Sequence, residues 1–130
     1  MFTIGQIHEA FAKVKSGSDF PTFVQDLKKI GITHYDNFVS DGRTIYYGQD
    51  EFLLNVDAKY PEIQVSKVGS PEDLKQAIQI HQQGQTDYPT FCTQAADAGV
   101  HKWTTDTIKM TVTYLDITER ALVVEPIPVS

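Results

Sequence analysis

The sequence contains a single cysteine, Cys92, among its 130 residues. One thiol excludes an internal disulfide framework and fits a protein that works in a reducing compartment. The opening segment, MFTIGQIHEAFAKVK, contains neither the basic leader nor the continuous apolar run of a signal peptide. We therefore expect a cytoplasmic protein.

Long apolar runs and clusters of basic residues are also missing. No stretch of about 18 consecutive apolar residues occurs, so the sequence predicts no membrane-spanning helix. The 11 Lys and Arg residues are outnumbered by 17 Asp and Glu residues, which gives a net charge of −6. Nucleic-acid surfaces follow phosphates with clustered cations. The sequence therefore predicts neither a membrane nor a nucleic-acid partner.

Established catalytic and metal-binding spacings are absent as well. The four histidines form no HxH or HExxH pattern, and a single cysteine cannot form CxxC. There is no glycine-rich phosphate loop and no GxSxG nucleophile motif. The sequence accordingly predicts no cofactor and no metal site, and it identifies no catalytic residue.

What the sequence does contain is a long internal repeat. The segment DFPTFVQDLKKIGITHY, residues 19–35, returns 68 residues later as DYPTFCTQAADAGVHKW, residues 87–103, with five of 17 positions identical. Solenoid repeats are usually shorter, about 20–50 residues, and come in threes or more. We therefore expect a tandem duplication within a single domain of residues 1–130. Its units would be residues 1–65 and 66–130, related by pseudo-twofold symmetry.

Each unit is predicted to begin with two helices. The second helix opens at Asp-aromatic-Pro-Thr-Phe, where Asp19 or Asp87 can cap the first turn. It ends at Gly31 or Gly99, where a left-handed residue is needed. The first helix of each unit carries apolar residues at i, i+3, i+4 and i+7. Its predicted buried positions are Ile7, Ala10, Phe11 and Val14 in one unit, and Leu74, Ala77, Ile78 and His81 in the other.

Three short strands follow the helices in each unit. In the first unit an Asp-Gly turn at residues 41–42 predicts a hairpin. The strand segments TIYY (residues 44–47) and TVTY (residues 111–114) can be aligned in two ways that differ by one residue. The shift would exchange the faces of the strand, and this register stays open. The predicted fold class is α+β, an ααβββ order repeated twice, with the helices packed on a mainly antiparallel sheet.

Four residues are predicted to bind a ligand. Tyr35 and Trp103 occupy equivalent positions of the repeat, and aromatic rings with polar tips can line a groove. His34 and His101 lie on the corresponding strands close to them, but one position out of register, so they are expected to point to opposite faces of their strands. The alternative is plain sheet packing, because aromatic residues favour strands.

Cys92 falls in the first turns of a predicted helix, where the helix dipole can lower a thiol pKa. Its counterpart in the first unit is Val24, on the predicted buried face of the helix. Free cysteines are often buried as small apolar residues. A structural role in the core is therefore favoured over a nucleophile.

Several segments of the chain resemble one family. FPTFVQDLKKIGITHY, VSDGRTIYYG, HQQGQTDYPTFCTQAADAGVHKW and ALVVEPIP are similar to small bacterial and prophage-associated proteins called phage envelope protein, or YbcV-like proteins. The resemblance spans nearly the whole chain, and its two PTF segments are the most specific part. It implies a phage-related bacterial accessory protein, but no reaction, cofactor or site residue.

Three functions remain open at this point. The favoured one is a soluble interaction or small-ligand-binding module, with an unidentified protein or small molecule as partner. Such a module would form a homodimer through an edge strand such as ALVVEP, residues 121–126. The second is an enzyme with a cleft between the repeats, and the third is a structural component of a phage particle. The side chains that would act in the enzyme are Asp19, Asp87, His34, His101 and Cys92.

Overall fold

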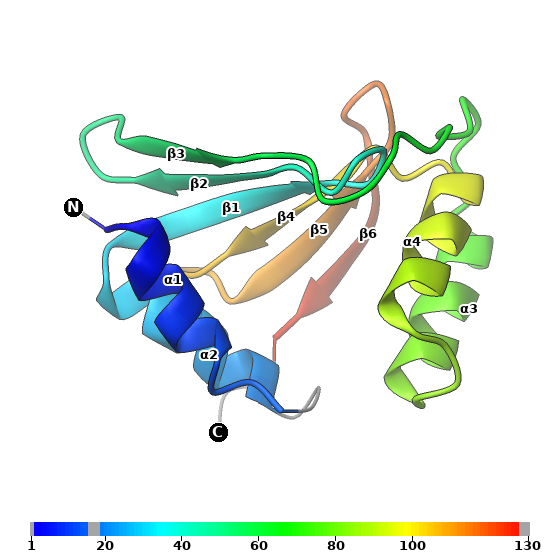
Figure 1. The fold of residues 1–130 in the computed structure, drawn as a ribbon. Helices are drawn as coiled ribbons and strands as arrows, with labels where there is room; N and C mark the ends of the chain where they lie inside the picture. Colours follow the sequence, from blue (N-terminus) through cyan, green and yellow to red (C-terminus); the bar gives the residue numbers. More distant parts are fainter. Residues whose placement is uncertain (1, 16–18, 128–130) are drawn as a thin grey trace.

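The computed structural model describes residues 2–15 and 19–127, which form four helices and six strands (Figure 1). In chain order these are α1 (Ile4–Phe11), α2 (Phe20–Lys29), β1 (Ile32–Phe38), β2 (Thr44–Gly48), β3 (Leu53–Val56), α3 (Pro71–Gln82), α4 (Tyr88–Asp97), β4 (Lys102–Asp106), β5 (Thr111–Leu115) and β6 (Ala121–Pro126). The order of two helices and three strands occurs twice. The molecule is a single α+β domain, and the predicted class is confirmed.

All six strands form one antiparallel sheet in the order β3-β2-β1-β4-β5-β6. The two halves of the chain meet at its centre, where Tyr35 of β1 pairs with Thr105 of β4. On either side of this seam, Tyr46 pairs with Tyr35 and Tyr114 pairs with Trp103. Tyr46 and Tyr114 thus occupy equivalent places, 68 residues apart, which is the offset of the sequence repeat and one residue away from the direct match of TIYY with TVTY. β6 is an edge strand, as predicted, and its pairing with a second copy stays a prediction.

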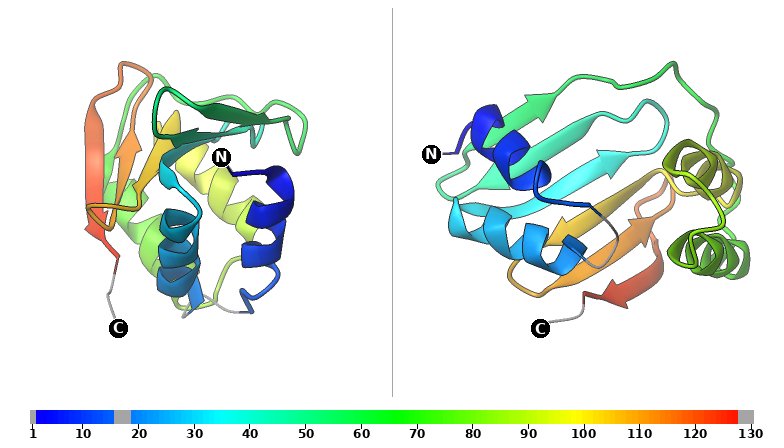
Figure 2. Two further views of the ribbon diagram at one scale, coloured as in Figure 1. Left: turned by 90° about the vertical axis from the view of Figure 1, so that its left-hand side faces the viewer. Right: turned by 60° about the horizontal axis from the view of Figure 1, so that its bottom comes forward.

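The four helices lie on the same side of the sheet (Figures 1 and 2). α1 and α2 bury Leu27 against Ile32 and Tyr35 of the first half. α3 and α4 bury Leu74 against Trp103 and other residues of the second half. Side chains of one strand alternate between faces, so the opposite face of the sheet presents its side chains where no described helix covers them.

The two Asp-aromatic-Pro-Thr-Phe segments open helices α2 and α4, as predicted, but only one aspartate caps its helix. Asp87 has extended backbone angles, and its carboxylate accepts the N–H of Thr90 at 2.9 Å. Asp19 has helical angles and makes no side-chain capping bond; its carboxylate accepts the N–H of Lys15 at 2.9 Å instead. A capping side chain needs the extended backbone. The capping prediction is confirmed at Asp87 and wrong at Asp19.

The predicted buried faces of the first helices are largely confirmed, because five of the eight residues are buried. These are Ile7, Ala10, Leu74, Ala77 and Ile78. The prediction that Phe11 is buried is wrong. Phe11 is the last residue of α1, and 61% of its surface is exposed although its ring meets Phe23 edge-on. His81 and Val14 are half-buried.

The connector (residues 57–70) runs from β3 to α3 without regular secondary structure (Figure 1). It is bonded to the turn between β1 and β2. The N–H of Ile63 donates to the carbonyl of Ser40 at 2.7 Å, and the Tyr60 hydroxyl donates to the carbonyl of Val39 at 2.5 Å. At Gly42, where φ is +77°, a Cβ would lie 2.7 Å from the Tyr60 ring. The turn therefore needs glycine there, and the connector is fixed against it.

Candidate functional site

Two of the four predicted ligand-binding residues lie in the core. Tyr35 is 5% exposed and packs on Tyr46 at 5.2 Å between ring centroids. Trp103 is 9% exposed and packs on Phe91 and Tyr114, each at 5.8 Å. Burial raises the pKa of the Tyr35 hydroxyl far above its ordinary value. Both rings are therefore in the environment expected of residues that pack in the core of the sheet, which was the alternative to ligand binding.

The other two predicted residues, His34 and His101, lie on the uncovered side of the sheet. His34 of β1 stacks on Tyr47 of β2, with ring centroids 4.3 Å apart and planes 8° apart. His101 immediately precedes β4, and its ring meets Phe38 edge-on at 5.5 Å. The alternation of β1 puts His34, Asp36 and Phe38 on one face. The expectation that the two histidines point to opposite faces is wrong, because His101 lies just before β4 and does not follow its alternation. Both rings lie on one surface, with a charged cluster between them.

A nearly buried carboxylate is the centre of this cluster. Asp36 is 6% exposed, and its Oδ1 accepts the Thr104 hydroxyl at 2.5 Å. Its Oδ2 lies 3.4 Å from Lys102 Nζ and accepts the Tyr47 hydroxyl at 3.4 Å. Lys102 Nζ also lies 3.4 Å from Glu119 Oε1. Burial alone would lower the pKa of Lys102, but the charges and hydrogen bonds of the two carboxylates outweigh it and raise that pKa.

A second cation lies beside Lys102. The guanidinium carbon of Arg43 is 4.4 Å from the centroid of the Phe38 ring, and Lys102 Nζ is 5.7 Å from it. Attraction between cation and ring holds the guanidinium in place. Within the described residues Arg43 forms no ion pair, whereas Lys102 forms two. The closeness of Arg43 and Lys102 to one ring could not be predicted from the sequence, because the two residues come from different halves of the chain and only the β1–β4 pairing brings them together.

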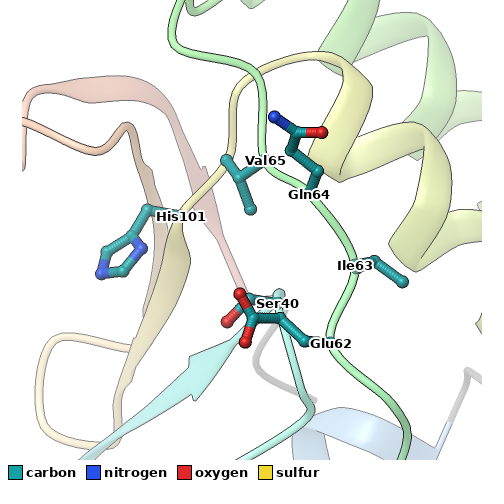
Figure 3. Close-up of a pocket in the computed structure, with 6 residues that line it drawn as sticks. All are labelled: Ser40, Glu62, Ile63, Gln64, Val65 and His101. Atoms are coloured by element: carbon teal, nitrogen blue, oxygen red, sulfur yellow. The ribbon is translucent and has the colours of Figure 1, made fainter.

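A hollow of about 460 Å³ opens at the end of the sheet beside His101 (Figure 3). Its lining residues are Ser40, Glu62, Ile63, Gln64, Val65 and His101. Figure 3 shows the oxygens of Ser40 and Glu62 side by side, with the His101 ring at the left of the view. Ile63 points away from His101 and packs against the core of the second half. Hydroxyl, carboxylate, amide and imidazole groups beside apolar walls are the usual mixture of a small-molecule site.

The side chains proposed for an enzyme cleft do not converge. His34 and His101 are on the uncovered side, while Asp87 caps α4. Asp19 accepts a backbone N–H before α2, and Cys92 is 2% exposed in the core. Among the described residues, no group of three or more His, Cys, Asp or Glu side chains is placed to hold a metal ion. The part of the chain that the structure describes also contains no helix long and apolar enough to cross a membrane.

Cys92 lies in an environment that keeps its thiol protonated. Burial raises the pKa of the thiol, and hydrogen bonds to Tyr60 and Tyr88 and the nearby Lys59 only partly offset this. A buried neutral thiol is chemically inert. The structure therefore agrees with the role in the core that the sequence favoured.

Alkylation measures this protection directly. We expect iodoacetamide to modify Cys92 in the folded protein at least about 100-fold more slowly than in guanidinium, because reaction requires local opening around α4. Mass spectrometry over time at mildly alkaline pH gives both rates. The matched control is Cys92→Ala combined with Thr93→Cys, which moves the thiol to an exposed neighbouring position and should remove most of the protection. Equal folded and unfolded rates for Cys92 would contradict the assignment.

Comparison with known proteins identifies the family. The chain is similar to the uncharacterized protein YcgX of Escherichia coli (strain K12), with 26% identity over 117 residues, which are 90% of this chain and 87% of that protein. Neither this description nor that of the matching family mentions a phage, so the bacterial part of the expected resemblance is supported and the phage-envelope part is not. Residues 8–126, which include the uncovered face and the hollow, match the family described as protein of unknown function (DUF1398). The chain belongs to the DUF1398 family.

Proposed function

We propose that the protein is a small-ligand-binding module and that its site is the hollow beside His101. The hollow itself carries the proposal. Its volume of about 460 Å³ falls within the usual range for ligand sites, and its polar groups come from the β1–β2 turn, the connector and the start of β4. His101, one of the four residues predicted from the sequence, is part of its wall.

The rigidity of the connector supports the proposal. Loops of this length without secondary structure are uncommon in compact domains and are usually functional or disordered. This connector is bonded in place at both Tyr60 and Ile63, and further on the N–H of Ser66 donates to the carbonyl of Ala96 at 2.9 Å. A wall that is already ordered lowers the entropic cost of binding.

We also infer that the fold arose by tandem duplication, as the repeat predicts. The repeated order of elements and the equivalent positions of Tyr46 and Tyr114 support this. A duplication supplies the helices and strands twice, but the segment that joins the two units only once. Four of the six residues that line the hollow, those at positions 62–65, belong to the connector, which is not one of the repeated helices and strands.

Protein NMR with a library of small polar compounds tests the site. We expect the amide shifts of hits to cluster at Ser40, at residues 62–65 and at His101. Replacing His101 with alanine should weaken binding about 5- to 10-fold, because one hydrogen-bonding wall of the hollow is lost. The matched control is His34→Ala, which removes a partly exposed imidazole of the same surface outside the hollow and should leave affinity unchanged. The proposal would be contradicted if the hits shift amides on the helix side of the sheet, or if their affinity is unchanged by His101→Ala.

A further inference from the structure

We infer that the ligand of the hollow is a short peptide with free ends, whose carboxylate pairs with Arg43 and whose ammonium pairs with Glu62. This inference rests on the proposed function and adds the class of ligand to it. It is carried by two charged groups of opposite sign: Glu62 lines the hollow with His101, and Arg43 lies over Phe38, the ring that contacts His101. Both are accessible, and neither is used in an ion pair among the described residues.

Arg43 provides the anion-binding end. Its guanidinium is held over the face of Phe38 at 4.4 Å. A guanidinium that stacks on a ring keeps the N–H groups of its edge free for a bidentate carboxylate. Two carboxylates of the same hairpin are engaged elsewhere: Asp41 accepts the backbone N–H of Arg43, and Asp36 is paired with Lys102.

Lys102, which lies near the same ring, differs from Arg43 in having carboxylate partners within the protein. It lies 5.7 Å from the Phe38 centroid and has Asp36 and Glu119 as partners, so its charge is neutralised within the protein. Arg43 is the cation that the fold places beside Phe38 without a carboxylate for its guanidinium. A ligand carboxylate would supply it.

Glu62 provides the opposite end. It belongs to the hollow, where its oxygens lie beside Ser40 in Figure 3, and it is exposed. A carboxylate in the hollow repels an anion and attracts an ammonium group, which can donate to it and to hydroxyl or carbonyl oxygens nearby. The hollow therefore favours the amino end of a zwitterion.

The separation of the two ends sets the length of the ligand. Arg43 contacts Phe38, Phe38 contacts His101 at 5.5 Å, and His101 is part of the hollow. These two ring contacts in succession keep the separation within the reach of a short peptide. At about 3.5 Å per residue of extended chain, a peptide of about three residues spans this distance.

Trialanine in four forms tests the inference. The probes are the free peptide, its N-acetyl form, its C-terminal amide and the doubly blocked form, each titrated by protein NMR. We expect the free peptide to bind most tightly at Ser40 and His101. Blocking either end should weaken binding about tenfold, the usual effect of losing one charge-assisted contact.

Two variants that each remove one charge test which residue binds which end of the peptide. Arg43→Gln should remove the advantage of a free carboxylate and leave that of a free ammonium, while Glu62→Gln should do the reverse. Lys109→Gln and Glu72→Gln make the same charge changes at exposed positions outside the hollow and should change nothing. Equal binding of all four peptides, or equal weakening of all four by Arg43→Gln, would overturn the inference.

The same data separate this inference from the proposed function. If library compounds bind in the hollow but no form of trialanine does, the peptide class is wrong and the ligand-binding module stands. If neither the compounds nor the peptides perturb Ser40 and His101, both are wrong.

Discussion

Replacing Asp36 with alanine is expected to lower the free energy of unfolding by about 3 kcal/mol, the lower end of the range for breaking a buried ion pair. The change leaves Lys102, whose side chain is only 15% exposed, without its main partner. It also leaves the hydroxyls of Thr104 and Tyr47 without their acceptor. Lys102 keeps Glu119, and this moderates the loss. Urea unfolding followed by fluorescence of the single tryptophan, Trp103, measures the difference.

Two further variants show whether the buried charge is the cause. Glu119→Gln removes a partner that is 68% exposed, and a surface pair of this kind contributes about 0–1 kcal/mol. The double variant Asp36→Ala with Lys102→Met should be more stable than Asp36→Ala alone, because no uncompensated ammonium remains. If Asp36→Ala is within about 1 kcal/mol of the wild type, the cluster is solvated and behaves as a surface ion pair.

The Asp36 cluster also positions the candidate site. It fixes Lys102 near Phe38, whose ring also contacts the Arg43 guanidinium and the His101 ring. A buried ion pair is weak evidence for stability, since apolar residues of similar size often stabilise as well. The Asp36 cluster on the uncovered face is therefore better explained by the residues that it holds in position than by its contribution to the free energy of folding.

Local pattern was sufficient to predict most elements. The Asp-Gly turn predicted the β1–β2 hairpin, and the Asp-aromatic-Pro-Thr-Phe segments predicted where α2 and α4 begin. These signals depend only on residues close together in the chain. The two aspartates of the repeat show the limit: identical motifs have different backbone angles at Asp19 and Asp87, and only the second permits a cap.

The candidate site needed pairings between distant parts of the chain. The sequence identified His34 and His101 but treated them as neighbours of Tyr35 and Trp103, because it could not show which face the helices cover. Asp36 was not identified, since its partners Thr104 and Lys102 come from β4. The connector contains no motif that indicates a site, and only its bonds to the β1–β2 turn make it the wall of a hollow.

Replacing Gly99 with alanine should destabilise the protein by at least about 3 kcal/mol, whereas the same change at Gly31 should cost about 1 kcal/mol. Both glycines end the second helix of a unit with positive φ, +88° at Gly99 and +103° at Gly31, so both substitutions carry the strain of the left-handed region. At Gly31 a Cβ meets nothing within 4 Å. At Gly99 it would lie 2.6 Å from the carbonyl oxygen of Val68 and 2.7 Å from Cα of Gly69.

The difference depends on whether the end of the connector can move. The Ser70 N–H donates to the carbonyl of Ala98 at 2.8 Å, and Gly69 is itself packed so closely on Leu122 that a Cβ there would be 2.7 Å from it. A shift that relieves the clash at Gly99 must break these contacts, and this is why the larger loss is expected. Urea unfolding of the two variants gives the comparison, in which Gly31→Ala is the control for backbone strain alone. If both variants lose the same stability, the connector adjusts easily, and the ordered wall that supports ligand binding in the hollow would lose its physical basis.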